Sequence, residues 1–411
     1  MKIRQNILDE IVQDLSNKRH SILMGARQVG KTTLVKQLLA LLKSEKKNCF
    51  YFTLEDPHIL RDFNAHPEKL FDYTSTVDLT IEDTQLYVII DEIQYLSDPT
   101  NFLKLLFDKY APQLKIIATG SSAFYIDKNF KDSLAGRKKL IEVYPLDFEE
   151  FIAFKNQEDI LNEYKRIRNN KNEKSSSEQL LRSLFNEFLT FGGYPAVVLE
   201  SNFSEKRELL AEYVNSYIKK DILEANLKDD YKIFQLLTLL SHQAGALLNT
   251  HELANTLQVA SGTMEKYLYL LKKGFHIQNV MPKFGNIRKE LSKMPKVYFN
   301  DLGLRNHLCR NFEPIDSRPD KGVLIENYAY LRLKKKFGID NLRFWRTIDG
   351  HEVDFVIEKD GGEGLAFEIK YNFAQFNEKK YTKFLETYPD YSLKVLSYQA
   401  QGNAENDIFL F

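Results

Sequence analysis

The stretch from residue 21 to residue 33 constrains this chain most, because it places a phosphate-binding loop between a strand and a helix. It reads S-I-L-M-G-A-R-Q-V-G-K-T-T, and residues 34–42 continue with strong helix formers. The pattern G-x-x-x-x-G-K-[ST] in this strand, loop and helix context predicts a nucleotide site. Its four fixed positions would occur by chance in a chain this long on the order of 1% of the time. We therefore expect an α/β fold built on a parallel sheet.

The residues of this loop each have an expected part in holding a nucleoside triphosphate. Gly25 and Gly30 let the backbone curl so that successive N–H groups point at the phosphates, and the helix that follows adds its positive N-terminal end. Lys31 is expected to reach the β- and γ-phosphates, and Thr32 to place its hydroxyl on Mg²⁺. The sequence thus predicts ATP and Mg²⁺ as cofactors, bound by Gly25, Ala26, Arg27, Gln28, Val29, Gly30, Lys31, Thr32 and Thr33.

A second apolar run ends in two acids. Residues 86–92 read L-Y-V-I-I-D-E, which is long and apolar enough for a strand buried on both faces. We expect Asp91 to hold Mg²⁺ and Glu92 to polarise the attacking water, so that Glu92 and Lys31 are catalytic. The alternative is a strand that merely ends at charged surface residues. Adjacent acids suit the activation of water better than the transfer reaction of a P-loop kinase.

Two further positions are candidates for the hydrolytic half of the site. The apolar run 114–118 leads into Thr-Gly-Ser-Ser, where Ser121 and Ser122 are placed to bridge the γ-phosphate and the water, although such a turn is also an ordinary loop or helix cap. Arg137 precedes another strand at 139–143. It could neutralise charge on the transferring phosphoryl group, in its own subunit or in a neighbour's, or it could be a solvated arginine beside two lysines.

Four segments together carry a resemblance to a known family: G-A-R-Q-V-G-K-T-T, V-I-I-D-E-I-Q-Y, A-T-G-S-S-A and L-A-G-R. They resemble the AAA-type ATPases of prokaryotes that have a characteristic C-terminal domain of uncertain function. The resemblance implies a sheet with strand order 5-1-4-3-2 and a ring-forming or DNA-associated protein. It also implies a homo-oligomer, such as a hexamer, if Arg137 acts across subunits. One departure is that no arginine after residue 150 stands out as the second sensor of an AAA+ lid.

The middle of the chain reads as helices and then as a basic hairpin. Residues 148–234 have a helical pattern, broken by a polar loop at 169–177 and by Gly192-Gly193-Tyr194-Pro195, and predict a helical lid over the nucleotide. Helices at 251–257 and 262–273, followed by two short strands around residues 283–286, predict a winged helix-turn-helix. Residues 271–296 have a net charge of +6, from Lys272, Lys273, Lys283, Arg288, Lys289, Lys293 and Lys296 against Glu290.

This positive charge suits phosphate contacts along duplex DNA. Winged helices also dock onto proteins, and a basic hairpin is often only solvated surface. DNA and a protein partner therefore both remain open at this element.

The last hundred residues contain an ordered set of acids. Glu326 lies on an amphipathic helix at 324–336, Asp354 on a strand at 350–357, and Glu368 and Lys370 on a strand at 365–371. Strand alternation puts Glu368 and Lys370 on one face, and a glycine turn brings Asp354 close. The set resembles the PD-(D/E)xK nuclease core, which implies acids that hold Mg²⁺ and a lysine that stabilises the attacking water. The alternative is a group of surface salt bridges of little energetic weight.

Composition limits the remaining possibilities. The 57 basic and 57 acidic residues leave no net field to attract nucleic acid or membrane. Cys49 and Cys309 lie too far apart in the sequence to suggest a disulfide framework or a zinc site, which fits a cytoplasmic location. The sequence has no stretch of about 18 apolar residues, so no membrane span is predicted.

Four domains are expected: an AAA-type ATPase domain (1–150), a helical lid (151–235), a winged helix-turn-helix (236–310) and a small α/β restriction-endonuclease-like domain (311–411).

The sequence thus predicts an ATPase that couples hydrolysis to an action on DNA through its C-terminal half. One alternative is a nucleotide-dependent switch that binds a protein partner through the winged helix, with an inactive nuclease-like scaffold. The other is a metal-dependent DNA nuclease gated by ATP.

Overall fold

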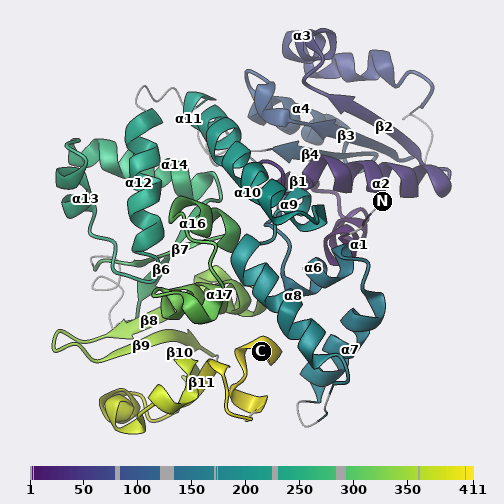
Figure 1. The fold of residues 1–411 in the computed structure, drawn as a ribbon. Helices are drawn as coiled ribbons and strands as arrows, with labels where there is room; N and C mark the ends of the chain where they lie inside the picture. The colour runs from purple at the N-terminus through teal and green to yellow at the C-terminus, as the bar shows by residue number, and fades with distance from the viewer. Residues whose placement is uncertain are drawn as a thin grey trace. The chain divides into compact units, whose positions relative to one another are not determined.

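The computed structural model describes residues 2, 4–78, 84–120, 134–170, 173, 175–224, 230–283, 293–359, 362–402 and 404–411 (Figure 1). The chain divides into two compact units. Unit 1 comprises Met1–Pro145, Tyr217–Leu227 and Lys273–Phe275. Unit 2 comprises Leu146–Ser216, Lys228–Lys272 and His276–Phe411.

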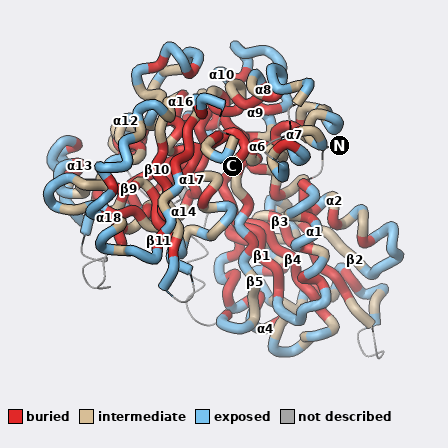
Figure 2. The backbone as a smooth tube through the Cα atoms, turned by 90° about the horizontal axis from the view of Figure 1, so that it is seen from below, coloured by how far each residue is buried: buried red, intermediate tan, exposed pale blue. Residues whose placement is uncertain are grey.

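Unit 1 is built on a parallel sheet in the order β2-β3-β4-β1-β5. Its strands are β1 (His20–Met24), β2 (Asn48–Thr53), β3 (Leu86–Asp91), β4 (Leu114–Gly120) and β5 (Lys138–Glu142). This order confirms the one that the family resemblance implied. Strands β1, β3 and β4 are buried along their whole length (Figure 2), as expected for apolar runs covered on both faces.

Helices of unit 1 flank this sheet: α1 (Gln5–Asp14), α2 (Lys31–Ser44), α3 (Pro57–Ala65) and α4 (Pro99–Tyr110), with 3₁₀ turns η1 (Pro67–Tyr73) and η2 (Ile93–Tyr95). α2 packs against β2, β3 and β4, and α4 packs against β4. Proline at the first turn and an aspartate cap start both α3 and α4. The phosphate loop follows the carboxyl end of β1, and Asp91 and Glu92 lie at the carboxyl end of β3.

Unit 2 contains one mixed sheet in the order β11-β10-β9-β8-β6-β7. The strands are β6 (Ile277–Pro282), β7 (Lys296–Phe299), β8 (Leu342–Arg346), β9 (Glu352–Glu358), β10 (Gly364–Asn372) and β11 (Tyr391–Gln399). The pairs β10/β11 and β6/β8 are parallel, and the other three pairs are antiparallel. The hairpin β6–β7, predicted as a wing, therefore continues the sheet of the predicted nuclease-like segment.

The α-helices of unit 2 surround this sheet. They are α6 (Phe148–Phe154), α7 (Glu158–Asn169), α8 (Glu178–Phe191), α9 (Pro195–Leu199), α10 (Phe203–Glu212), α12 (Asp230–His242), α13 (Thr250–Thr256), α14 (Ser261–Lys273), α16 (Leu302–Leu308), α17 (Lys321–Phe337) and α18 (Thr382–Thr387). A π-helical turn (Tyr213–Ile218) follows α10 and passes from unit 2 into unit 1, to which α11 (Lys219–Glu224) belongs. Short 3₁₀ turns lie at Ile315–Ser317, Ile339–Asn341, Phe373–Gln375, Glu378–Tyr381, Ala404–Asn406 and Ile408–Leu410.

Helices α6, α7 and α8, which the sequence analysis assigned to a nucleotide lid, bury their aromatic faces inside unit 2. The ring of Phe148 lies 5.2 Å from that of Phe185, which in turn lies 4.9 Å from Tyr328 on α17 and 5.3 Å from Phe409. Periodicity identified the apolar face of each helix but not the surface that covers it. The lid role stays a prediction.

The Gly192-Gly193-Tyr194-Pro195 break is a close contact between the end of α8 and the start of α16. Gly192 has φ of 73°, and a Cβ there would lie 2.4 Å from Oδ1 of Asp301. The backbone N–H of Gly193 donates to Asp301 at 2.7 Å, and that of Leu304 does so at 2.8 Å. Asp301 thus caps α16 and fixes the glycine turn at once.

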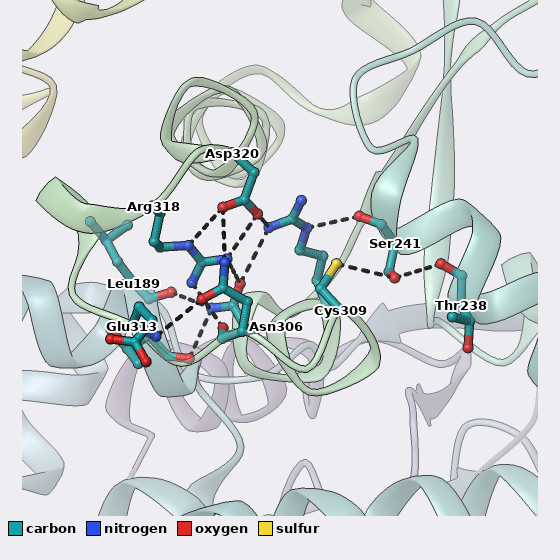
Figure 3. Close-up of polar contacts among 11 residues, drawn as sticks. Leu189, Thr238, Ser241, Asn306, Cys309, Glu313, Arg318 and Asp320 are labelled. Carbon is teal, nitrogen blue, oxygen red and sulfur yellow. Dashed lines mark hydrogen bonds and ion pairs between the residues drawn. The ribbon is translucent and has the colours of Figure 1, made fainter.

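A buried polar network ties α8, α12 and α16 to the start of α17 (Figure 3). Asp320 accepts hydrogen bonds from Arg305 and from Arg318, whose Nε lies 2.9 Å from its Oδ1. Arg305 also donates to the carbonyl of Ser241, and the amide of Asn306 donates to two carbonyls at the end of α8, each at 2.9 Å.

Among the described residues, no helix is both long enough and apolar enough to cross a membrane.

Candidate functional site

The predicted phosphate loop, residues 25–30, connects the end of β1 to the start of α2. A Cβ on Gly25 would lie 2.0 Å from the carbonyl oxygen of Val143, so only glycine lets the chain pass here. Gly30 is the N-cap of α2, and no described side chain caps that helix. The first N–H groups of α2 therefore keep their hydrogen-bonding capacity for an anion.

Lys31 lies inside this loop. Its ammonium donates to the carbonyls of Gly25 and Ala26, both at 2.8 Å, and the residue is only 5% exposed. Ala26 and Val29 are fully buried and anchor the loop. Arg27 and Gln28 belong to the same loop, and Thr33 belongs to the first turn of α2.

Asp91, at the end of β3, is the meeting point of three hydroxyl groups. Its Oδ2 accepts from Thr32 at 2.9 Å and from Tyr51 at 2.8 Å, while its Oδ1 accepts from Thr119. Burial and the hydrogen bond to Asp91 raise the pKa of Tyr51, so this phenol remains a donor. A hydroxyl and a carboxylate brought together fit Mg²⁺, whose remaining ligands in such sites are phosphates and water.

Glu92 follows β3 in a left-handed conformation, with φ of 60° and ψ of 51°. Its backbone N–H donates to Thr119 Oγ1 at 3.0 Å, and the side-chain amide of Gln94 donates to its Oε2. The orientation of Glu92 is therefore set by two neighbours that the sequence analysis did not single out.

Thr119, Tyr51 and Gln94 are thus additions to the candidate site. The carboxyl ends of parallel strands meet at one edge, so the strand pattern could have identified Thr119, near the end of β4, as a site residue. Tyr51 is two residues before Thr53, which pairs with Asp91, and shares its face by alternation. No sequence signal distinguishes Gln94.

Ser121 and Ser122 lie outside the described residues. Arg137 lies at the amino edge of the sheet, because β5 begins at Lys138 opposite His20 and reaches Met24, the end of β1, only at Glu142. Four residues of strand, about 13 Å, separate that edge from the phosphate loop. Nε of Arg137 instead contacts Asp108 at 2.6 Å. The structure does not bring Arg137 to the loop of its own chain.

A second cluster lies in unit 2, where the structure brings together Glu326, Asp354, Glu368 and Lys370. Oδ2 of Asp354 accepts the backbone N–H of Ile369 at 2.8 Å, and Lys370 donates to Glu368. The side chain of Glu368 is 6% exposed, so this is not a surface ion pair. Burial, and then the charge of Asp354, raise the pKa of Glu368 to about 7. Burial likewise raises the pKa of Glu326 to about 7.

Lys296 of β7 enters this cluster, although the sequence analysis grouped it with residues that face DNA. Its Nζ lies 2.5 Å from Glu352, 3.0 Å from Glu326 and 3.6 Å from Asp354, and its side chain is 3% exposed. Burial by itself lowers the pKa of Lys296. The nearby acids, of which Glu326 has the largest effect, raise it by more than burial lowers it, so the amine stays charged.

Lys283, another member of the basic set, is paired in the same way. It lies 2.7 Å from Glu358 and over the rings of Tyr388 and Tyr391. Lys283 and Lys296 are therefore buried and paired with acids, so the charge count overstates the positive charge on the surface of this segment. Arg288, Lys289 and Glu290 lie outside the described residues. Within the described part of the chain, no three His, Cys, Asp or Glu side chains are arranged to hold a metal ion.

Three family models match consecutive parts of the chain. Residues 17–152 match a family described as an AAA domain. Residues 182–315 and 321–409 match two families described as domains of unknown function, DUF8612 and DUF4143. The first match coincides with the parallel sheet and phosphate loop of unit 1. This match supports an AAA-type P-loop ATPase fold for residues 17–152.

Whole-chain relatives are similar over most of their length. An uncharacterized protein of Methanocaldococcus jannaschii is 26% identical, over 93% of this chain and 82% of its own. An uncharacterized protein of Haemophilus influenzae is 24% identical, over 90% and 88%. Among solved structures, the Walker-type ATPase of Pyrococcus abyssi superimposes with a TM-score of 0.47 at 15% identity, covering 75% of this chain and 96% of that one.

Proposed function

We propose that this chain binds ATP with Mg²⁺ at the phosphate loop of unit 1 and hydrolyses it. The observation that carries the proposal is the convergence of Thr32 and Asp91, 2.9 Å apart, beside Lys31 and Glu92. A P-loop kinase would need an acceptor group in place of water. Glu92, fixed next to the magnesium-binding carboxylate, is suited to water.

Each residue then has a defined part. Lys31 and the loop amides bind the phosphates, and Thr32 and Asp91 hold Mg²⁺, which supplies charge neutralisation at the β- and γ-phosphates. Glu92 orients and polarises the attacking water. Thr119 touches both Asp91 and the backbone of Glu92, so it is a positioning residue.

ATP turnover with Mg²⁺ in Glu92→Gln tests this proposal. The variant should bind ATP as the parent does, while turnover falls by about 100-fold, the size typical of a lost general base. Glu45→Gln, at the exposed glutamate that follows α2, is the matched control and should hydrolyse ATP normally. Full turnover in Glu92→Gln would remove Glu92 from its role.

For unit 2, we propose a winged helix-turn-helix at α13, α14 and the β6–β7 hairpin. Its support is the succession of two helices, each starting within one residue of the predicted position, and an antiparallel hairpin. DNA is the partner that would couple it to hydrolysis. Single-stranded, duplex or branched DNA should then raise ATP turnover, with an effect that weakens steeply with salt. Turnover that is the same with every DNA favours the protein-binding switch.

We also propose that residues 311–411 of unit 2 are nuclease-like in fold. Its support is the meeting of a helix glutamate, a strand aspartate and a Glu-x-Lys pair from α17, β9 and β10. If it is an ATP-gated nuclease, DNA cleavage with Mg²⁺ or Mn²⁺ must disappear in Asp354→Ala. A mutant that cuts as well as the parent points to contamination.

A further inference from the structure

One lysine is shared by three carboxylates at the centre of the nuclease-like cluster. Lys296 comes from β7, whereas Glu326 comes from α17 and Glu352 and Asp354 come from β9. Its Nζ lies 2.5 to 3.6 Å from an oxygen of each acid. With 3% of its side chain exposed, this ammonium is inside the unit and is not a surface charge.

Most oxygens of the cluster already have a donor. Oε1 of Glu326 also accepts from the hydroxyl of Tyr298 at 2.7 Å. Oε2 of Glu352 accepts from Arg346 at 3.0 Å, and Oδ2 of Asp354 accepts a backbone N–H. Oε1 of Glu368 accepts from Lys370, and burial raises the pKa of this carboxyl.

The charge of the cluster is close to balanced. With all four acids ionised, Glu326, Glu352, Asp354 and Glu368 face the cations Lys296, Lys370 and Arg346, which leaves one net negative charge. A divalent cation in a partly buried site needs carboxylates that are not already neutralised. It would also lie against the ammonium of Lys296, and like charges at such a distance repel strongly in a low-dielectric surrounding.

The backbone between α12 and α13 pairs with β7 and lies beside the cluster on one side. The N–H of Gly245 donates to Val297 at 2.8 Å, and that of Leu248 donates to Pro295 at 2.7 Å. A Cβ on Gly245 would come within 3.0 Å of Oε1 of Glu326. Lys296 is thus held between this segment, the sheet and α17, and has little room to withdraw.

We infer that the ammonium of Lys296 takes the position where the nuclease resemblance places the metal. The cluster is then a structural ion-pair network without metal that joins β7 to α17 and β9. The residues present do not fit a divalent cation. This inference rests on the proposed nuclease-like character of unit 2 and is independent of ATP hydrolysis in unit 1.

Counting bound Mn²⁺ by electron paramagnetic resonance in the nucleotide-free full chain tests the inference. Asp354→Asn should bind the same number of ions as the parent, because the cluster holds none in either. If Asp354→Asn removes an Mn²⁺ ion that the parent binds, or if the parent cleaves DNA in a manner that depends on Asp354, the inference is overturned. Neither result would alter the ATPase proposal, which concerns other residues.

The second variant is Lys296→Met, which keeps the length of the side chain and removes its charge. It should melt at a lower temperature than the parent, and Mn²⁺ should restore much of the loss by binding the freed acids. Adding Asp354→Asn should abolish that gain. Lys293→Met, at an exposed lysine, is the matched control and should do neither. An unchanged melting temperature in Lys296→Met would contradict a structural role for these ion pairs. If this variant does not fold, the comparison of Mn²⁺ binding by the parent and Asp354→Asn decides whether the cluster holds a metal.

Discussion

Thr119 donates its hydroxyl to Asp91 and accepts the backbone N–H of Glu92 at 3.0 Å. One side chain on β4 therefore positions both acids at the end of β3. Because Asp91 also accepts from Thr32 and Tyr51, the two acids belong to one hydrogen-bonded unit.

Replacing Thr119 with valine tests this positioning role, since valine has nearly the same shape and no hydroxyl. The change leaves the Glu92 N–H unpaired, at a cost of about 1–3 kcal/mol. We expect ATP turnover to fall by roughly 10-fold or more, with ATP binding in the absence of Mg²⁺ unchanged. Thr190→Val, on α8, is the control. Equal losses of binding and turnover would indicate a purely structural role.

Arg137 lies too far from its own phosphate loop to act there, so any catalytic part must be played in a neighbouring subunit. We expect Arg137→Ala to bind ATP normally and to lose turnover. Mixing it with inactive Glu92→Gln protein should recover part of the parental rate, because each chain supplies what the other lacks. If Arg137→Ala hydrolyses ATP at the parental rate, Arg137 serves only its ion pair with Asp108.

Asp320 balances two buried arginines in unit 2, Arg305 and Arg318. Removing one partner of a buried ion pair leaves the remaining charge uncompensated, and such losses cost about 3–5 kcal/mol. We expect Asp320→Asn to lower the free energy of unfolding of unit 2 by about 3 kcal/mol. Asp340→Asn, at an exposed aspartate, should leave it unchanged in the same denaturant titration. Similar unfolding of the two variants would contradict the role of the network.

The raised pKa of Asp301 makes its contribution to the stability of unit 2 fall as pH rises. Burial raises the pKa of Asp301 to about 6 from its usual 3.8, so between these values the folded protein holds a proton that the unfolded chain has released. Its contribution to stability is present below pH 4 and is lost as pH rises through 6, by roughly 3 kcal/mol in total. The stability difference between the parent and Asp301→Asn should shrink over this range in denaturant titrations. A difference that grows with pH would contradict the assignment, and Asp390→Asn is the exposed control.

Local patterns predicted much of unit 1. The apolar run before Asp91 and the loop before Lys31 each specify their own backbone, and the strand order 5-1-4-3-2 of the sheet followed from the family resemblance. Contacts between residues that lie far apart in the sequence were harder to predict. Tyr51 and Gln94 reach the site through strand pairing and side-chain orientation, which motif spacing does not encode.

In unit 2 as well, local patterns predicted short-range contacts and did not predict contacts between distant segments. The Glu-x-Lys pair of β10 was placed on one face by alternation alone, and Lys370 does contact Glu368. Lys296 was misassigned because its burial depends on the pairing of β6 with β8, a contact between segments about 60 residues apart in sequence. Basic composition near a hairpin does not reveal which lysine the sheet buries.

The most direct test of the account is the binding and turnover of Mg²⁺-ATP by the parent and Lys31→Ala. Lys31 lies within the loop, and its loss removes the cation expected on the β- and γ-phosphates. The account predicts saturable binding and steady hydrolysis by the parent and by Lys43→Ala, an exposed lysine in the last turn of α2, and neither by Lys31→Ala. A parent without saturable ATP binding, or a Lys31→Ala protein that behaves like it, would contradict the central claim.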